Sequence, residues 1–283
     1  MEVYLFTVIY ATFNCIFYLI FKIFMNILDK IVAAKKIEVA ERKVATPLSI
    51  LTQNPAFKEP CFSLKRSLKR AGSTGIIAEH KRKSPSLGFI REHSDVVEVV
   101  KGYAKAGAAC LSVLTDEPFF GGTMSDLRAA RRAVEIPILR KDFMIDEYQI
   151  YEAKANGADV ILLIAECLSK KEVKILAECA KNVGLEVLLE MHDDEGLDKI
   201  CDAVTCVGIN NRNLKTFDVS IQTSIDLSKL IPDSFVKVAE SGISNPQTLP
   251  LLRSYGFQGF LIGEAFMKTE NPGEAIADFI SRI

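Results

Sequence analysis

The chain has 283 residues, of which 49% are hydrophobic and 25% are charged, so it is long enough to bury one large core. Its formal net charge of −1 argues against nucleic acid as a partner. The seven cysteines form no CxxC pair and several lie in apolar runs, which indicates reduced, packed thiols and a cytoplasmic protein.

The first 24 residues form an almost wholly apolar segment. Val3 to Phe21 is interrupted only by two threonines and one asparagine, and it is long enough to span a bilayer. It lacks the basic n-region and the small-residue cleavage site of a secretory signal. Three interpretations compete: a membrane anchor, a helix packed on the protein, and an upstream extension from a misplaced start codon. We favour the extension, so a membrane is a partner only if this segment is a genuine anchor.

Residues 25–73 precede the first predicted strand. Met25 opens an amphipathic helix, and an extended stretch containing Pro47, Pro55 and Pro60 follows it. A second, basic helix comes next. We expect this part to cap the main fold, so residues 25–283 are treated as one unit.

From Gly75 onward, short apolar runs alternate with helix-length amphipathic segments. Gly157 and Gly184 are placed to end helices just before a strand begins. Eight such repeats predict a (β/α)₈ TIM barrel, because an open doubly wound sheet usually has fewer strands and often a GxGxxG turn, which is absent. The predicted strands are Gly75–Glu79, Cys110–Leu114, Pro137–Lys141, Val160–Ala165, Glu186–Glu190, Cys206–Asn210, Val236–Glu240 and Gly259–Ile262; helices are predicted at Ser125–Val134, Glu147–Asn156, Lys170–Val183 and Pro246–Ser254.

The first predicted strand ends abruptly in charge. Strand alternation points Glu79 and Lys81 to one side and His80 to the other. Ser84 belongs to a Ser-Pro-Ser turn whose hydroxyls and backbone donors suit an anion. In barrel enzymes the carboxyl ends of the strands carry the chemistry, although a solvated basic turn also explains this pattern.

Other strands deliver chemically useful residues to the same rim. Lys141, Glu190 and Asn210 each end a predicted strand, and Arg212 follows shortly after Asn210. Taken singly, these are explained equally by an exposed ion pair, a solvated strand end and a turn residue. Two lysines, several carboxylates and an asparagine on one rim favour an active site instead.

The last two strands end in glycine-containing turns. In this fold a phosphate commonly lies between these two loops, where backbone N–H groups must approach it closely. Ser241, Gly242 and Gly263 provide such turns, although glycines that simply turn the chain are the alternative. The three histidines lack metal-ligand spacing, so we expect neither a metal site nor a cofactor.

The ordered motifs resemble those of the indole-3-glycerol-phosphate synthase family from about Met25 to the C-terminus. The resemblance implies ring closure of 1-(2-carboxyphenylamino)-1-deoxyribulose 5-phosphate with loss of carbon dioxide and water. It is carried by IIAEHKRKSPS (Ile76–Ser86), LSVLTDEPFFGGT (Leu111–Thr123), PILRKDFMIDEYQI (Pro137–Ile150), LLIAECL (Leu162–Leu168), LLEMHD (Leu188–Asp193), GINNRNL (Gly208–Leu214), VAESGI (Val238–Ile243) and LIGEAFM (Leu261–Met267).

The resemblance also implies roles for the rim residues. Lys141 would be the principal general acid and Glu190 the general base. Lys81 would hold the substrate carboxylate or share acid duty, while Glu79 and Asn210 orient the reacting groups. A cationic neighbour such as Lys81 is expected to lower the pKa of Lys141.

The remaining residues implied by the resemblance bind substrate. Arg212 would support the rim. Phe119, with its neighbour Phe120, would wall the aromatic ring of the substrate, although a hydrophobic contact at the barrel rim explains these two residues equally well. Glu264 stands where some members have serine, so the backbone must hold the phosphate without that hydroxyl. The residues expected around the phosphate are Ser84, Ser241, Gly242 and Gly263.

Two other functions stay open at this stage. One is another phosphate-binding barrel of amino-acid biosynthesis, such as phosphoribosylanthranilate isomerase or the tryptophan synthase α subunit. Neither of these is expected to show a Glu-x-Lys pair followed by Ser-Pro-Ser. The other is a membrane-tethered barrel that binds a phosphorylated metabolite without converting it; Lys141 and Glu190 argue against it. We expect a monomer or a weak homodimer.

Overall fold

A computed structural model describes residues 26–213 and 218–283 of the chain. The predicted apolar segment at residues 1–24 lies outside these ranges. Within them, no helix combines the length and the apolar character needed to cross a bilayer.

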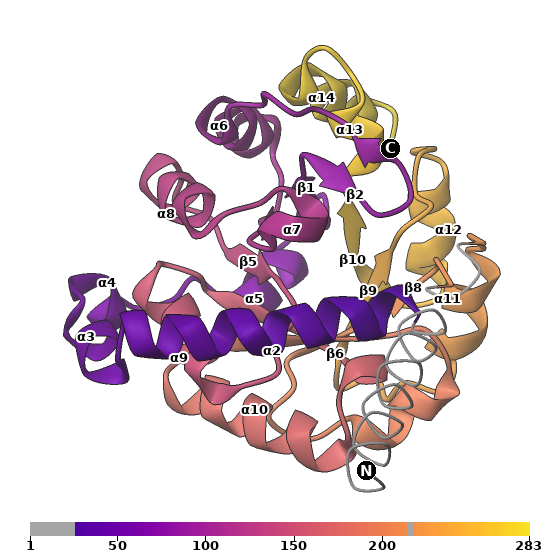
Figure 1. Ribbon diagram of the computed structural model, residues 1–283. Coiled ribbons are helices and arrows are strands. Elements are labelled where there is room, and N and C mark those ends of the chain that lie inside the picture. Colours follow the sequence, from indigo (N-terminus) through magenta and orange to yellow (C-terminus); the bar gives the residue numbers. More distant parts are fainter. Residues whose placement is uncertain (1–25, 214–217) are drawn as a thin grey trace, which may run out of the picture.

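Eight parallel strands close into a barrel, which confirms the predicted TIM-barrel fold (Figure 1). Around the barrel the order is β1-β10-β9-β8-β7-β6-β5-β4, so each strand pairs with its neighbour in sequence and the last pairs with the first. All eight predicted strands are present, with small shifts at their ends. Their bounds are β1 Ile76–His80, β4 Cys110–Leu114, β5 Ile138–Lys141, β6 Val160–Ile164, β7 Glu186–Met191, β8 Cys206–Asn210, β9 Val236–Glu240 and β10 Phe257–Ile262.

The strands form because they are apolar on both faces. All five residues of β6, VILLI, are buried, as expected for a parallel strand covered on both sides. Alternate residues divide between two cores. Ile77 and Leu162 belong to the cluster inside the barrel, whereas Ile76 and Leu163 join the larger cluster beneath the outer helices.

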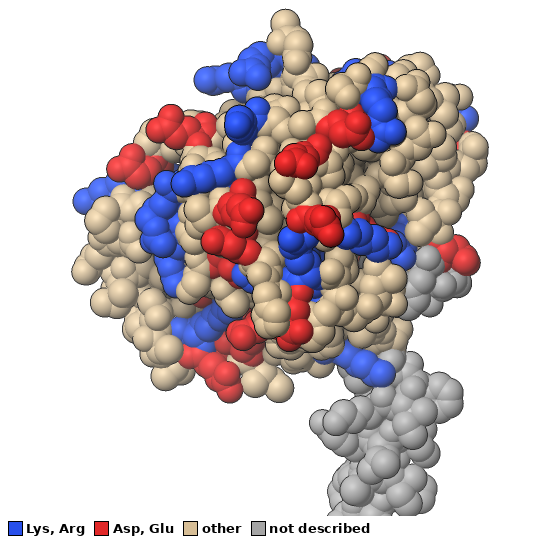
Figure 2. All heavy atoms as spheres, turned by 90° about the horizontal axis from the view of Figure 1, so that it is seen from above, with Lys and Arg blue, Asp and Glu red and all other residues tan. Residues whose placement is uncertain are grey.

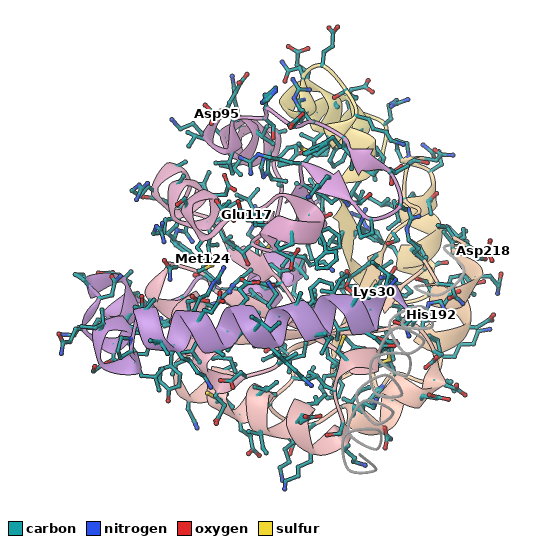
Figure 3. The ribbon with its side chains drawn as sticks, in the orientation of Figure 1. Lys30, Asp95, Glu117, Met124, His192 and Asp218 are labelled. Atoms are coloured by element: carbon teal, nitrogen blue, oxygen red, sulfur yellow. The ribbon has the colours of Figure 1, made fainter. Side chains whose placement is uncertain are left out.

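An outer layer of helices covers the barrel. In Figure 3, Asp95 and Met124 mark the starts of α6 and α8. Gly157 and Gly184, with φ of 84° and 82°, follow α9 and α10 as predicted. The helices after β1 are α6 Val96–Ala106, α7 Glu117–Phe120, α8 Met124–Ala133, α9 Glu147–Ala155, α10 Lys170–Asn182, α11 Gln222–Ser228, α12 Thr248–Ser254, α13 Glu264–Met267 and α14 Pro272–Ser281, with 3₁₀ turns η1 Ala165–Cys167 and η2 Asp194–Lys199.

The N-terminal part caps the barrel, as predicted. Helix α2, Ile27–Ala45, lies across the barrel face in Figure 1 and is followed by α5, Leu64–Lys69. The prediction of an extended proline-containing stretch between them was wrong. Two short helices, α3 (Leu48–Gln53) and α4 (Pro55–Lys58), occupy it, because proline is well tolerated at the first position of a helix.

Two further features complete the described chain. A two-stranded antiparallel sheet, β2 (Lys83–Ser84) and β3 (Gly88–Phe89), follows β1. Figure 2 shows lysines and arginines interspersed with acidic side chains on the face that it presents.

Candidate active site

One cavity of about 580 Å³ lies at the carboxyl ends of the strands. Helix α2 closes part of it with Ile27, Leu28 and Ile31. Ten of the eleven predicted site residues line this cavity, namely Glu79, Lys81, Ser84, Lys141, Glu190, Asn210, Arg212, Ser241, Gly242 and Gly263.

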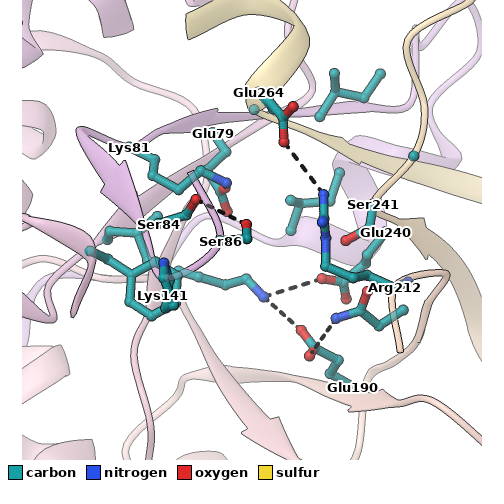
Figure 4. Close-up of a pocket in the computed structure, with 18 of the residues that line it drawn as sticks. Glu79, Lys81, Ser84, Ser86, Lys141, Glu190, Arg212, Glu240, Ser241 and Glu264 are labelled. Atoms are coloured by element: carbon teal, nitrogen blue, oxygen red, sulfur yellow. Dashed lines mark hydrogen bonds and ion pairs between the residues drawn. The ribbon is translucent and has the colours of Figure 1, made fainter. Parts of the chain in front are cut away.

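Lys141 lies between the buried side chains of Glu190 and Glu240 at the centre of the site (Figure 4). Its Nζ is 2.6 Å from Glu190 Oε2 and 3.2 Å from Glu240 Oε2. Lys141 ends β5, Glu240 ends β9 and Glu190 is the penultimate residue of β7, so the closed barrel is what brings them together. The ammonium is thus held where a substrate in the cavity can take a proton from it.

The expected lowering of the Lys141 pKa was wrong. Burial alone lowers this pKa, but the carboxylates of Glu190, Glu240 and Glu79 outweigh burial and hold it above its ordinary value. The prediction considered the neighbouring cation Lys81 and left out the three carboxylates. Lys141 is therefore protonated throughout the neutral range, as a general acid must be at the start of a reaction.

Glu190 is oriented from both sides. Its Oε2 accepts from Lys141, and its Oε1 accepts a 3.0 Å hydrogen bond from Asn210 Nδ2. Asn210 is itself fixed, because its Oδ1 accepts from the backbone N–H of Arg212 at 3.0 Å. Burial raises the pKa of Glu190, but Lys141 and Asn210 bring it below its ordinary value, so the carboxylate is ionised and available as a base.

Glu240 is the functional candidate that the sequence reasoning did not select, although it was recognised as a strand-end residue. Its side chain is buried, and the structure gives its Oε1 no hydrogen-bond partner. Gly208 in β8 makes room for it, since a Cβ at that position would lie 2.2 Å from Glu240 Oε1. Burial, together with the adjacent Glu190 carboxylate, raises the pKa of Glu240 to about 8 despite the opposing charge of Lys141.

This pKa predicts a pH dependence of turnover. Glu240 is neutral below about pH 8 and ionised above it, and a second carboxylate makes the Lys141 ammonium a weaker acid. We expect kcat to fall as the pH rises through about 8, and Glu240→Gln to lack this alkaline limb. Steady-state rates between pH 6 and 10 test the prediction. An identical alkaline limb in the variant would assign the titration to another group.

Lys81 and Glu79 form a second ion pair in the cavity, with 2.8 Å between Nζ and Oε1. Ser112 donates a 3.1 Å hydrogen bond to the other carboxylate oxygen of Glu79. Burial raises the pKa of Glu79, but Lys81 and Lys141 bring it below its ordinary value. His80 points away, as strand alternation predicted, and its Nε2 lies 2.9 Å from Ser94 Oγ.

The predicted phosphate loops approach the same cavity. Ser241 and Gly242 have φ of 65° and 71°, a left-handed conformation that glycine adopts without cost and serine adopts less often. Glu264, unlike a serine at this position, has no hydroxyl to offer to a phosphate. Its carboxylate instead forms an ion pair with Arg212 at 3.4 Å (Figure 4). A second ion pair, at 2.5 Å, joins it to Lys268.

The aromatic wall differs by one residue from the prediction. Phe120 and Phe143 line the cavity, with ring centroids 6.0 Å apart, whereas Phe119 is not among the lining residues. Phe119 and Phe120 are adjacent in the short helix α7, which turns successive side chains by about 100°. The motif alone did not indicate which of them faces inward.

Comparison with known proteins places the chain in a family. A family model described as "Indole-3-glycerol phosphate synthase" matches residues 28–279. The chain belongs to this family. It is 48% identical over 258 residues to the indole-3-glycerol phosphate synthase of Bacteroides thetaiotaomicron, covering 91% of this chain and 99% of the relative. The corresponding protein of Paracidovorax citrulli is 44% identical over 260 residues, covering 89% and 98%.

Solved structures with a similar fold are more distant in sequence. The 3-hexulose-6-phosphate synthase of Salmonella typhimurium is similar with a TM-score of 0.58 and 14% identity, covering 74% of this chain and 99% of that one. A tryptophan synthase α-subunit mutant from Pyrococcus furiosus gives a TM-score of 0.55 at 17% identity, covering 74% and 96%. At such identities the likeness concerns the barrel fold alone.

Proposed function

We propose that this protein closes the pyrrole ring of 1-(2-carboxyphenylamino)-1-deoxyribulose 5-phosphate, releasing carbon dioxide and water to give indole-3-glycerol phosphate. The observation that carries the proposal is Lys141 held between Glu190 and Glu240, beside the Lys81–Glu79 pair, in one cavity. Family membership supports the same reaction.

The first step requires a general acid and a cation that pairs with the carboxylate of the substrate. The electron-rich ring carbon that bears the carboxylate attacks the ketone, and Lys141 donates its proton to the ketone oxygen as the new bond forms. Lys81, with a flexible cationic side chain at the cavity wall, pairs with the substrate carboxylate or shares the acid duty. Loss of carbon dioxide then restores the aromatic ring.

The second step is a dehydration. The hydroxyl formed from the ketone leaves as water with a proton from Lys141 once solvent has reprotonated this lysine, or from Lys81 if the acid duty is shared. A carbon-bound proton must also be removed so that the pyrrole forms. Glu190 is the group proposed to take that proton, because its carboxylate is ionised and oriented by Asn210. Glu79 keeps Lys81 in place through their 2.8 Å ion pair.

The cavity lining offers groups suited to each end of the substrate. Phe120 and Phe143 provide an apolar surface for the aromatic ring. Ser84, Ser241, Gly242 and Gly263 surround the proposed phosphate position, and Arg212 supports this rim.

Phosphate recognition gives a testable prediction. Inorganic phosphate should compete weakly with substrate, and Gly242→Val should abolish this competition, because a side chain would intrude where backbone N–H groups approach the anion. The Glu264→Gln variant should still be inhibited competitively by inorganic phosphate. Steady-state inhibition by phosphate measures both effects.

A matched control addresses backbone strain. Gly242 has a positive φ, and its added Cβ would lie 2.3 Å from Val219 Cγ1, so the valine also strains the loop. Gly184 has φ of 82° with nothing within 4 Å of an added Cβ, so Gly184→Val imposes the same kind of backbone strain far from the site. Unchanged phosphate inhibition in a folded Gly242→Val protein would place the anion elsewhere.

The direct test of function is incubation of the purified protein with the proposed substrate. Formation of fluorescent indole product at a rate that depends on enzyme concentration is the expected result. Tight substrate binding without product would favour the non-catalytic binding protein considered above.

We further propose a cytoplasmic protein, present as a monomer or weak homodimer. The six cysteines in the described residues are all free, as expected in a reducing compartment. Equilibrium sedimentation of the purified full chain tests the oligomeric state.

A further inference from the structure

A buried lysine from the N-terminal helix reaches the segments after two barrel strands. Lys35 lies in α2, and its side chain is 1% exposed. Its Nζ is 3.0 Å from Asp116 Oδ2, 2.9 Å from Asp142 Oδ1 and 2.7 Å from Glu38 Oε2. A lysine is almost never fully buried unless its charge is paired, and here three carboxylates pair it.

The two aspartates hold active-site segments. Asp142 directly follows Lys141, and its other oxygen accepts hydrogen bonds from Arg140 at 2.9 Å and Thr115 at 2.7 Å. Asp116 accepts a 2.9 Å hydrogen bond from the backbone N–H of Phe119 and thereby caps α7. Lys35 therefore ties the end of β5, the start of α7 and helix α2 to one point.

Arg140 does not make Lys35 redundant. Arg140 also pairs with Asp142, but its remaining contacts are with Thr115, Gln149 and Glu152, and none is with Asp116. Without Lys35, Asp116 loses the cation 3.0 Å from its carboxylate, and Asp142 keeps a cation on one oxygen only. On the oxygen that Lys35 contacts, the carboxylate next to Lys141 would then keep only the 2.8 Å hydrogen bond from the backbone N–H of Phe143.

We propose that Lys35 is a positioning residue for Lys141, fixing the backbone of the general acid through Asp142. The inference rests on the proposed function. Lys141 Nζ must stay near both Glu190 and Glu240, and a misplacement of about 1 Å costs on the order of 10²-fold in rate. Lys35 does not itself line the cavity, so it acts through Asp142 and not on the substrate.

The test compares two lysines of α2. In Lys35→Met we expect kcat to fall at least about tenfold while KM changes less than about threefold, because the phosphate loops are untouched. Lys43 pairs with Asp146 at 2.7 Å on the same side of the barrel but is 45% exposed. Lys43→Met should keep kcat within about twofold. Inhibition by inorganic phosphate should be unchanged in both.

A second variant keeps the proposal testable if Lys35→Met does not fold. Lys35→Met alone leaves Asp116 buried without its cation, which can prevent folding. Lys35→Met/Asp116→Asn removes one charge of each sign, and asparagine still caps α7. The double variant should fold, shown by cooperative thermal unfolding, and should still show the loss of kcat.

The outcomes separate the possibilities. A folded variant, single or double, with kcat within about threefold of wild type would overturn the positioning role. An equal loss of kcat in Lys43→Met would also overturn it, because loosening of α2 as a whole would then explain both. A wild-type protein that forms no indole in the same assay would count against the proposed function instead.

Discussion

Lys141→Met should abolish measurable turnover while the substrate still binds. Methionine keeps the length and apolar stem of lysine but cannot donate a proton, and loss of one positioned acid costs on the order of 10²–10⁴-fold in rate. Binding should survive because the aromatic wall and phosphate loops do not involve this side chain. Steady-state indole formation and equilibrium titration with a non-cyclising substrate analogue measure the two quantities.

The control is the same substitution at a distant, exposed lysine. Lys170 on α10 is 69% exposed and pairs only loosely with Asp198, at 3.7 Å. Lys170→Met should retain kcat within about twofold. If Lys141→Met kept more than about a tenth of wild-type kcat, the principal acid would have to be another group, with Lys81 the next candidate.

The barrel was predictable because its signals are local. Each strand is a short apolar run, some strands such as β5 and β9 end in a charged residue, and glycines such as Gly157 mark the preceding helix ends. The closure of parallel strands then brings their carboxyl ends together, which is why Lys141 and Glu190 could be placed on one rim from the sequence.

The parts that were missed depend on three-dimensional environment. The charge state of Lys141 is set by carboxylates from three other strands, and the sequence does not give their distances. Glu240 became a candidate only when its burial and its 3.2 Å contact with Lys141 were visible. In the sequence, Lys35 is one of several lysines on a predicted amphipathic helix, and only the packing of α2 against the barrel shows that it is buried.

Glu190→Gln should stop the reaction after ring closure. Glutamine preserves the shape of the side chain and can still accept from Asn210, but it cannot take a proton from carbon. The acid step at Lys141 does not need this base, so the ring-closed intermediate should accumulate. Overall turnover should fall on the order of 10²–10⁴-fold. Single-turnover mixing followed by acid quench and separation of the products measures the intermediate directly.

A glutamate on the same strand gives the control. Glu186 opens β7 at the opposite end of the barrel, where its carboxylate accepts from Ser63 Oγ at 2.5 Å and from the backbone N–H of Lys65 at 3.0 Å. Glu186→Gln should leave the partition between intermediate and product unchanged, even if the protein becomes less stable. A quenched Glu190→Gln reaction that contained only unreacted substrate would assign Glu190 to the first step. Its 2.6 Å ion pair with Lys141 would then serve mainly to orient the acid.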